Sequence, residues 1–101
     1  MSGQTYYGKS VIITGASSGI GMELAKQLAA QGASLTLAAR NIEKLNELVI
    51  LCQSIGGKAI AVQTDVSNAD QCRHLVDKAV QVYGRIDLLI NNAGITMWAL
   101  L

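Results

Sequence analysis

Proline is absent from this sequence of 101 residues, and cysteine, charge and long apolar runs are all scarce. Without proline, nothing inside the chain marks a linker, so we expect residues 1–101 to form a single domain. The longest apolar runs, such as Leu48 to Cys52, are a handful of residues, whereas a membrane-spanning helix needs ~20. Residues 1–9 are polar and lack the apolar segment of a signal peptide. We therefore predict neither a signal peptide nor a membrane-spanning segment.

Charged residues are too few and too balanced to attract a polyanionic partner. Only 15% of the residues are charged, the net charge is +1, and the eight lysines and arginines are scattered without a basic run. This pattern argues against binding to nucleic acid or to an anionic membrane. Half of the residues are apolar, which is enough to build the core of a small folded domain.

The two cysteines predict neither a disulfide framework nor a metal site. Cys52 and Cys72 form no Cys-x-x-Cys motif, and the one histidine, His74, has a single cysteine near it. We expect two reduced thiols on helices of a cytoplasmic protein, and no bound metal.

Strand-like runs alternate with helical patterns along the chain. Four short apolar or β-branched runs predict strands at 9–14, 34–39, 58–64 and 86–90. Three intervening segments carry apolar residues at helical spacing, each followed by a glycine. The expected apolar stripes contain Ile20, Leu24 and Leu28 in the first helix, Leu45, Leu48, Cys52 and Ile55 in the second, and Cys72, Val76, Ala79 and Tyr83 in the third.

Two helix starts can be predicted from capping residues. Asn41 is suited to cap the second helix, because its side-chain oxygen can accept from a free backbone amide. Ser67 and Asp70 are spaced as in a capping box, which predicts Ser67 as the N-cap of the third helix.

The order β-α-β-α-β-α-β requires helical crossovers, which join parallel strands in a right-handed sense. The expected fold class is α/β, a Rossmann-like doubly wound parallel sheet in half-domain form, with strand order 3-2-1-4. The fourth strand would then be an apolar edge, and the apolar residues Ile95 to Leu101 follow it. We expect the chain to be the N-terminal, apparently truncated, part of a longer protein.

The segment Thr14 to Gly21 follows the first strand and opens the first helix. Backbone amides at such a helix start, with the positive end of the helix dipole, form an anion site, and glycines permit a phosphate to approach closely. The glycines are spaced G-x-x-x-G-x-G, which is neither G-x-G-x-x-G nor a P-loop. A nucleotide site is the favoured interpretation, and a plain strand-to-helix turn is the alternative.

Together with the tetrad Asn91, Asn92, Ala93 and Gly94 after the fourth strand, this segment resembles the classical short-chain dehydrogenase/reductase family. The resemblance covers about Lys9 to Gly94. It implies an oxidoreductase that transfers a hydride between a nicotinamide and a small-molecule carbonyl or alcohol substrate. It leaves open which substrate the protein uses and whether the protein forms a homo-oligomer.

The resemblance also implies cofactor contacts, position by position. Around the phosphates and the adenosine ribose it places Gly15, Ser17, Ser18, Gly19 and Ile20, with Gly21 allowing close packing of the first helix. It assigns the adenine to Asp65 and Val66, and the nicotinamide side to Asn91, Asn92, Ala93 and Gly94. Asp65 could instead be a turn carboxylate, and the two asparagines could cap the end of a strand.

The residues after the second strand favour NADP(H) over NAD(H). An NAD site generally has an acid there to hold the ribose hydroxyls, but this chain has Ala38, Ala39, Arg40 and Asn41. The guanidinium of Arg40 could bind a 2′-phosphate that a carboxylate would repel. Ser17 could add a hydroxyl and Lys44 a weaker second cation, while the alternative for Arg40 is a solvated loop residue.

The family's proton-transfer pair, Tyr-x-x-x-Lys, is missing from the 101 residues. Tyr6, Tyr7 and Tyr83 are each followed four positions later by a residue other than lysine. We therefore expect the NADP(H)-binding portion of a short-chain oxidoreductase, with no catalytic residues within 1–101 and no activity alone. The alternatives are a stand-alone non-catalytic nucleotide-binding or interaction fragment, and an unrelated Rossmann-like binder of another nucleotide.

Overall fold

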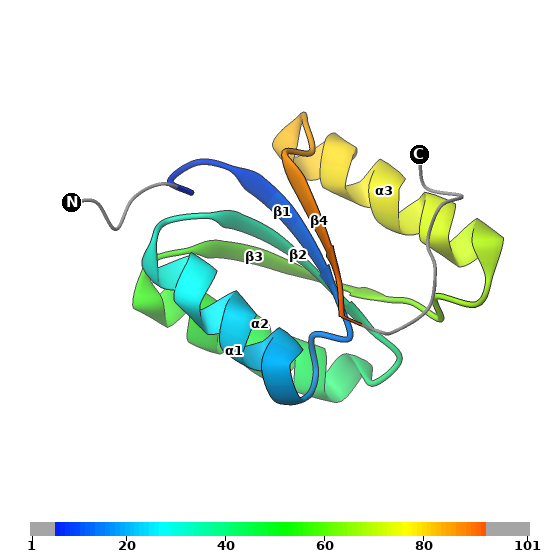
Figure 1. Cartoon of the computed structure of the whole chain (residues 1–101), viewed down its shortest axis with the longest axis horizontal. Coiled ribbons are helices and arrows are strands. Elements are labelled where there is room, and N and C mark those ends of the chain that lie inside the picture. The colour runs from blue at the N-terminus through cyan, green and yellow to red at the C-terminus, as the bar shows by residue number, and fades with distance from the viewer. Residues whose placement is uncertain (1–5, 93–101) are drawn as a thin grey trace.

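The computed structural model describes residues 6–92, in which four strands alternate with three helices (Figure 1). The elements are β1 (Ser10–Thr14), α1 (Gly19–Ala30), β2 (Ser34–Ala39), α2 (Ile42–Ile55), β3 (Lys58–Gln63), α3 (Ala69–Tyr83) and β4 (Leu88–Asn91). All strand pairs are parallel, and the order across the sheet is β3-β2-β1-β4. The predicted Rossmann-like half-domain is thereby confirmed.

The sheet has a hydrophobic core on each face, because side chains alternate along each strand. Val11, Ile13, Leu35 and Leu37 belong to the core that packs against α1 and α2, which cover one face of the sheet (Figure 1). Ile12 and its neighbours pack against α3 on the opposite face. The three central residues of β1 are at most 1% exposed, as expected for a strand covered on both sides.

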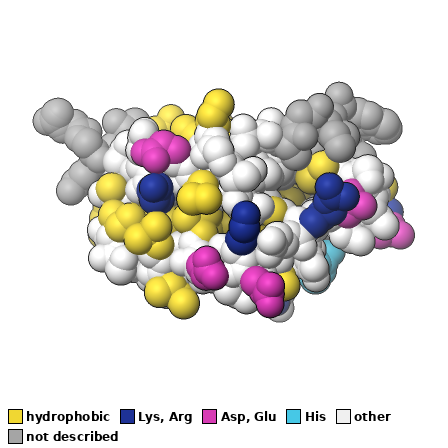
Figure 2. Space-filling view, turned by 90° about the horizontal axis from the view of Figure 1, so that it is seen from below, with side chains coloured by type: hydrophobic (Ala, Val, Ile, Leu, Met, Phe, Trp, Pro, Cys, Tyr) yellow, Lys and Arg dark blue, Asp and Glu magenta, His cyan; other side chains and the backbone are white. Residues whose placement is uncertain are grey.

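The outer face of the α1–α2 layer carries a mixture of side chains. Figure 2 shows lysines or arginines interspersed with acidic residues and apolar groups across the visible face. The exposed apolar side chains of α2 include Ile50, Leu51 and Ile55, so the last residue of the predicted stripe lies partly in solvent. None of the helices within residues 6–92 is both long and apolar enough to cross a bilayer.

The predicted helix starts were half right. Asn41 caps α2, since its side-chain oxygen accepts from the Lys44 amide at 3.1 Å. The prediction for α3 was wrong, because Asn68 is the N-cap and accepts from the Gln71 amide at 3.1 Å. The Ser67 side chain instead turns back to Asp65.

The predicted apolar stripe of α1 was wrong at its first position. Ile20 is 70% exposed, and the buried residues of this helix are Gly21, Ala25, Leu28 and Ala29. The helix approaches the sheet through small residues, which places its buried face one position away from Ile20. The predicted strand ends also moved, since β1 begins at Ser10, β3 ends at Gln63 and β4 spans Leu88–Asn91.

Candidate functional site

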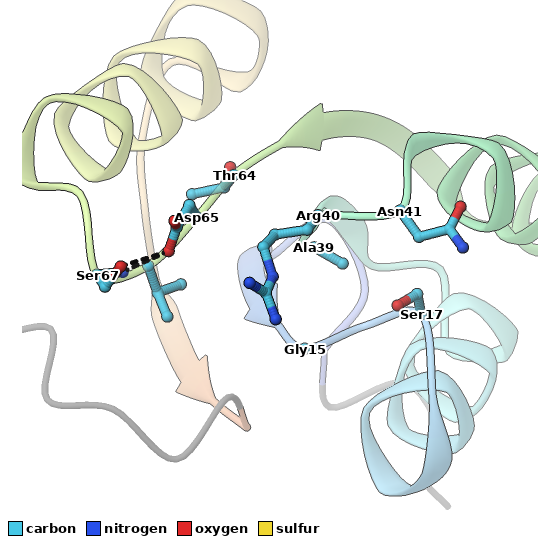
Figure 3. Close-up of a pocket in the computed structure, with 9 residues that line it drawn as sticks. Gly15, Ser17, Ala39, Arg40, Asn41, Thr64, Asp65 and Ser67 are labelled. Carbon is cyan, nitrogen blue, oxygen red and sulfur yellow. Dashed lines mark hydrogen bonds between the residues drawn. The ribbon is translucent and has the colours of Figure 1, made fainter.

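A cavity of about 410 Å³ lies at the carboxyl ends of β1, β2 and β3 (Figure 3). Three short segments form its walls, one after each of these strands. Its lining residues are Gly15, Ser17, Ala39, Arg40, Asn41, Thr64, Asp65, Val66 and Ser67. Ligands of open parallel sheets bind at this end of the strands, so the topology makes this cavity the candidate site.

The first wall is the glycine turn between β1 and α1. Gly15 and Gly19 have φ values of 63° and 52°, in the left-handed region that residues with a Cβ rarely adopt. A Cβ on Gly21 would overlap the carbonyl oxygen of Gly15 and would lie 2.7 Å from Nδ2 of Asn92. The turn and the start of α1 are therefore packed too closely for a larger residue at position 21.

The start of α1 differs from the starts of the other two helices. The N-cap Ser18 makes no side-chain cap hydrogen bond, whereas the asparagine side chains at the starts of α2 and α3 each accept from a backbone amide. Because the first amides of a helix lack intrahelical acceptors, those of α1 remain available to an anion. The residues around this helix start thus fit a phosphate group.

Within this turn, only Gly15 and Ser17 line the cavity. Ser18, Gly19 and Ile20 are exposed beside it, and Gly21 is buried beneath it. The predicted phosphate contacts thus all lie in one turn. Some of them line the cavity, and the others lie at the adjacent start of α1.

The second wall is the segment after β2, which contains Arg40. Its side chain extends into the space between Asp65 and Gly15 (Figure 3), and its carbonyl oxygen accepts from Nε2 of Gln63 at 2.9 Å. Within 38–41 this is the one charged residue. Lys44 lines a separate cavity of about 210 Å³ between α1 and α2, to which Ser17 also contributes.

The third wall is the segment after β3. One carboxylate oxygen of Asp65, Oδ1, accepts from the hydroxyl of Ser67 at 2.6 Å and from its backbone amide at 3.0 Å. These hydrogen bonds, and to a smaller degree the charge of Arg40, hold the pKa of the Asp65 carboxyl below its ordinary value. The carboxylate is therefore charged at neutral pH. Its hydrogen bonds to Ser67 also make it a turn carboxylate, which was the alternative interpretation of this residue.

Two asparagines, one at the end of β4 and one directly after it, contact the end of β1 and the glycine turn and do not line the cavity. Oδ1 of Asn91 accepts from the hydroxyl of Thr14 at 2.8 Å, and Nδ2 of Asn92 donates to the carbonyl oxygen of Gly15 at 3.2 Å. They therefore join the end of β4 to the end of β1. The predicted contacts Ala93 and Gly94 lie outside the residues that the structure describes.

Four lining residues escaped the sequence analysis as contacts, namely Ala39, Asn41, Thr64 and Ser67. Each is within two positions of a predicted contact, at the carboxyl end of a strand. The parallel topology alone could have identified them, since all such ends share one edge of the sheet. Residues 6–92 contain no cluster of three or more His, Cys, Asp or Glu that could hold a metal ion.

Comparison with known proteins gives a consistent family. A family model for short chain dehydrogenases matches residues 9–100. The 11-beta-hydroxysteroid dehydrogenase 1A of Arabidopsis thaliana is 46% identical over 94 residues, which are 92% of this chain and 27% of that protein. An uncharacterized oxidoreductase of Listeria monocytogenes is 46% identical over 91 residues, which are 90% of this chain and 37% of that protein. The chain thus spans well under half the length of these relatives.

Solved structures agree with the sequence relatives. A hydroxysteroid dehydrogenase from Escherichia coli superposes with a TM-score of 0.84 at 36% identity, covering 88% of this chain and 38% of that one. A short chain dehydrogenase/reductase from Burkholderia phymatum, solved in complex with NAD, gives a TM-score of 0.80 at 38% identity and covers 83% of this chain and 30% of that one.

Proposed function

The chain belongs to the short-chain dehydrogenase family, and from this membership we propose that it is the NADP(H)-binding portion of an oxidoreductase. The intact protein would transfer a hydride between the nicotinamide and the carbon of a carbonyl or alcohol substrate. The observation that carries the proposal is the cavity whose walls combine the glycine turn, Arg40 and Asp65.

Each wall suits one part of the dinucleotide. The amides at the start of α1, with Gly15 and Ser17, would hold the phosphates. Arg40 would bind the 2′-phosphate, and Asp65 and Val66 would contact the adenine. The nicotinamide side would lie toward Asn91 and Asn92, and the family pattern extends that assignment to Ala93 and Gly94.

The residue after β2 supports NADP(H) over NAD(H). A carboxylate in this position would hold the ribose hydroxyls of NAD and repel a 2′-phosphate. Arg40 presents a guanidinium that can form paired, charge-assisted hydrogen bonds to that phosphate. Because the Burkholderia phymatum relative was solved with NAD, family membership alone does not choose between the two cofactors.

The residues of this chain would bind and orient the cofactor, which supplies the hydride when bound. The Tyr-x-x-x-Lys pair that transfers a proton in the family is not among the 101 residues. The proposed role of this chain is therefore cofactor binding without turnover. The free, buried thiols of Cys52 and Cys72 fit a reducing compartment such as the cytoplasm.

Titration calorimetry of the 101-residue chain with NADPH, NADH and ATP tests the proposal. We expect NADPH to bind most tightly, NADH more weakly and ATP most weakly. Equal or tighter binding of NADH would contradict the assignment to NADP(H) while leaving dinucleotide binding in place. Tightest binding of ATP would contradict the dehydrogenase assignment itself, and would favour a binder of another nucleotide.

A further inference from the structure

We propose that Ser67 is a positioning residue that makes the base-binding wall of the cavity selective for a 6-aminopurine over a 6-oxopurine. The proposal rests on the proposed function, because it concerns the same cavity and takes Asp65 as the group that faces the base. Ser67 acts through Asp65 and need not touch the cofactor.

Ser67 binds one carboxylate oxygen of Asp65 and leaves the other for a ligand. Its hydroxyl and its backbone amide both donate to Oδ1, at 2.6 and 3.0 Å (Figure 3). Oδ2 receives no hydrogen bond from any residue in the range 6–92. Two donors on one oxygen restrict rotation of the carboxylate group, so the free oxygen has a defined direction. Both residues line the cavity.

The backbone beneath this carboxylate is held as well. The amide of Asp65 donates to Oε1 of Gln71 at 2.7 Å, and its carbonyl oxygen accepts from the amide of Asn68 at 2.9 Å. One residue earlier, the amide of Thr64 donates to the carbonyl oxygen of Ala39 at 2.9 Å, which ties this wall to the end of β2. The carboxylate therefore cannot escape an unfavourable ligand by a small shift of its segment.

A fixed carboxylate distinguishes purines by the group on carbon 6. An ionised carboxylate can only accept hydrogen bonds, so it pairs with the amino group of adenine. The carbonyl oxygen of hypoxanthine is itself an acceptor and would be repelled by the same oxygen. A carboxylate that could rotate freely would turn away from this carbonyl, and the discrimination would weaken. Selectivity thus requires the two hydrogen bonds from Ser67.

The experiment compares two reduced cofactors that differ only in the base, NADPH and its hypoxanthine analogue, nicotinamide hypoxanthine dinucleotide phosphate. Dissociation constants are measured by nicotinamide fluorescence for the unchanged chain and for Ser67→Val and Ser67→Thr. Because valine and threonine have the same shape, this pair isolates the hydroxyl. Ser54→Ala is the control, since the hydroxyl of this exposed serine of α2 also donates a local hydrogen bond, to the backbone carbonyl oxygen of Leu51, but lies outside the cavity lining.

For the unchanged chain we expect a preference for NADPH of about tenfold, the scale of one charge-assisted hydrogen bond in a partly open site. Ser67→Val should reduce the preference to roughly two- to threefold, because NADPH loses an oriented acceptor while the freed carboxylate can turn away from the hypoxanthine carbonyl. Ser67→Thr and Ser54→Ala should retain it. Thermal melting of each variant verifies that the chain stays folded.

Two results would overturn the inference while the proposed function stands: an unchanged chain that binds both cofactors equally, or a Ser67→Val variant that keeps the full preference or weakens both cofactors alike. If the unchanged chain binds neither cofactor, the proposed function fails first, and this inference fails with it.

Discussion

Several polar side chains next to the cavity form hydrogen bonds to the backbone of its walls and do not line the cavity themselves. Asn92 donates to the carbonyl oxygen of Gly15, Gln63 donates to that of Arg40, and Gln71 accepts from the amide of Asp65. Each of these contacts joins a wall to an element other than its own strand. The three walls are therefore fixed by residues that are not themselves in the cavity lining.

The Arg40 side chain is expected to decide the choice of cofactor. Replacing Arg40 with Asp in the full-length protein removes the guanidinium and adds a charge that repels a 2′-phosphate. A charged hydrogen bond contributes roughly 1.5–3 kcal/mol, so NADPH should bind about 10- to 100-fold more weakly. NADH should gain relative to NADPH, which a comparison of kcat/KM for the two cofactors measures.

The control for this variant is Arg73→Asp, which makes the same charge change at an exposed residue of α3 paired with Asp70. It should leave the ratio of the two cofactors unchanged. If the ratio of kcat/KM for NADPH to that for NADH is the same in the Arg40→Asp and unchanged proteins, Arg40 does not determine the choice of cofactor.

Gly21 is expected to tolerate no side chain. An added Cβ would overlap a backbone carbonyl oxygen, that of Gly15, which no change of rotamer can move. Gly21→Ala should therefore lower the free energy of unfolding by roughly 1–3 kcal/mol, although alanine normally favours a helix. Urea denaturation measures this difference, and a variant as stable as the unchanged chain would show that α1 can shift away from the turn.

At the scale of the helices, stability and binding make different demands on helix starts. Helices α2 and α3 begin with asparagine side chains that accept from backbone amides, whereas Ser18 leaves the first amides of α1 without that partner. Side-chain capping thus stabilises α2 and α3, the two helices for which no phosphate contact is proposed. The start of α1 remains available for a ligand.

This difference predicts unequal effects of capping substitutions. Asn68→Ala should lower the free energy of unfolding by about 1 kcal/mol, because the Gln71 amide loses its acceptor. Ser18→Ala should change it by less than about 0.5 kcal/mol, since no cap hydrogen bond is lost. Urea denaturation of the two variants provides the comparison, and an equal loss in both would show that Ser18 does cap α1 in solution.

Helix starts and faces were predictable only where local chemistry had one solution. Asn41 is the one cap-forming residue directly before its helix, and its role was predicted. Ser67 and Asn68 are adjacent and both suited to capping, so the choice between them depended on the tertiary contact that draws Ser67 to Asp65. The exposure of Ile20 likewise depends on how closely α1 packs on the turn, which helical periodicity does not contain.

Across the whole molecule, Asp87 joins two segments that are 77 residues apart. Its Oδ2 accepts from the amide of Ser10 at 2.8 Å, and Arg85 donates to both of its oxygens, each at 2.8 Å. The Arg85 side chain first, and the Ser10 amide second, lower the pKa of Asp87 from its ordinary 3.8 to about 2. The start of β4 is thus held beside the start of β1 by an ionised group.

Because the folded state lowers this pKa, the unfolded chain takes up the proton first as the pH falls. The stabilisation from Asp87 should be complete above about pH 4 and should be lost as the pH falls through about 2. Urea denaturation between pH 2 and 5 should therefore show a smaller pH dependence for Asp87→Asn than for the unchanged chain. Asp77→Asn, at an exposed position of α3, serves as the control and should retain the full dependence.

The sequence by itself determined the alternation of strands and helices, the parallel sheet and the glycine turn, because these depend on residue periodicity, on crossover length and on the backbone freedom of glycine. It also indicated the family, since the glycine segment after the first strand and the asparagine motif after the fourth together were enough. Only the tertiary structure decided that Ser67 binds the carboxylate of Asp65, and that Asn92 and Gln71 hold the walls of the cavity. These contacts depend on how the strand ends and the helices pack together, and not on any periodicity along the chain.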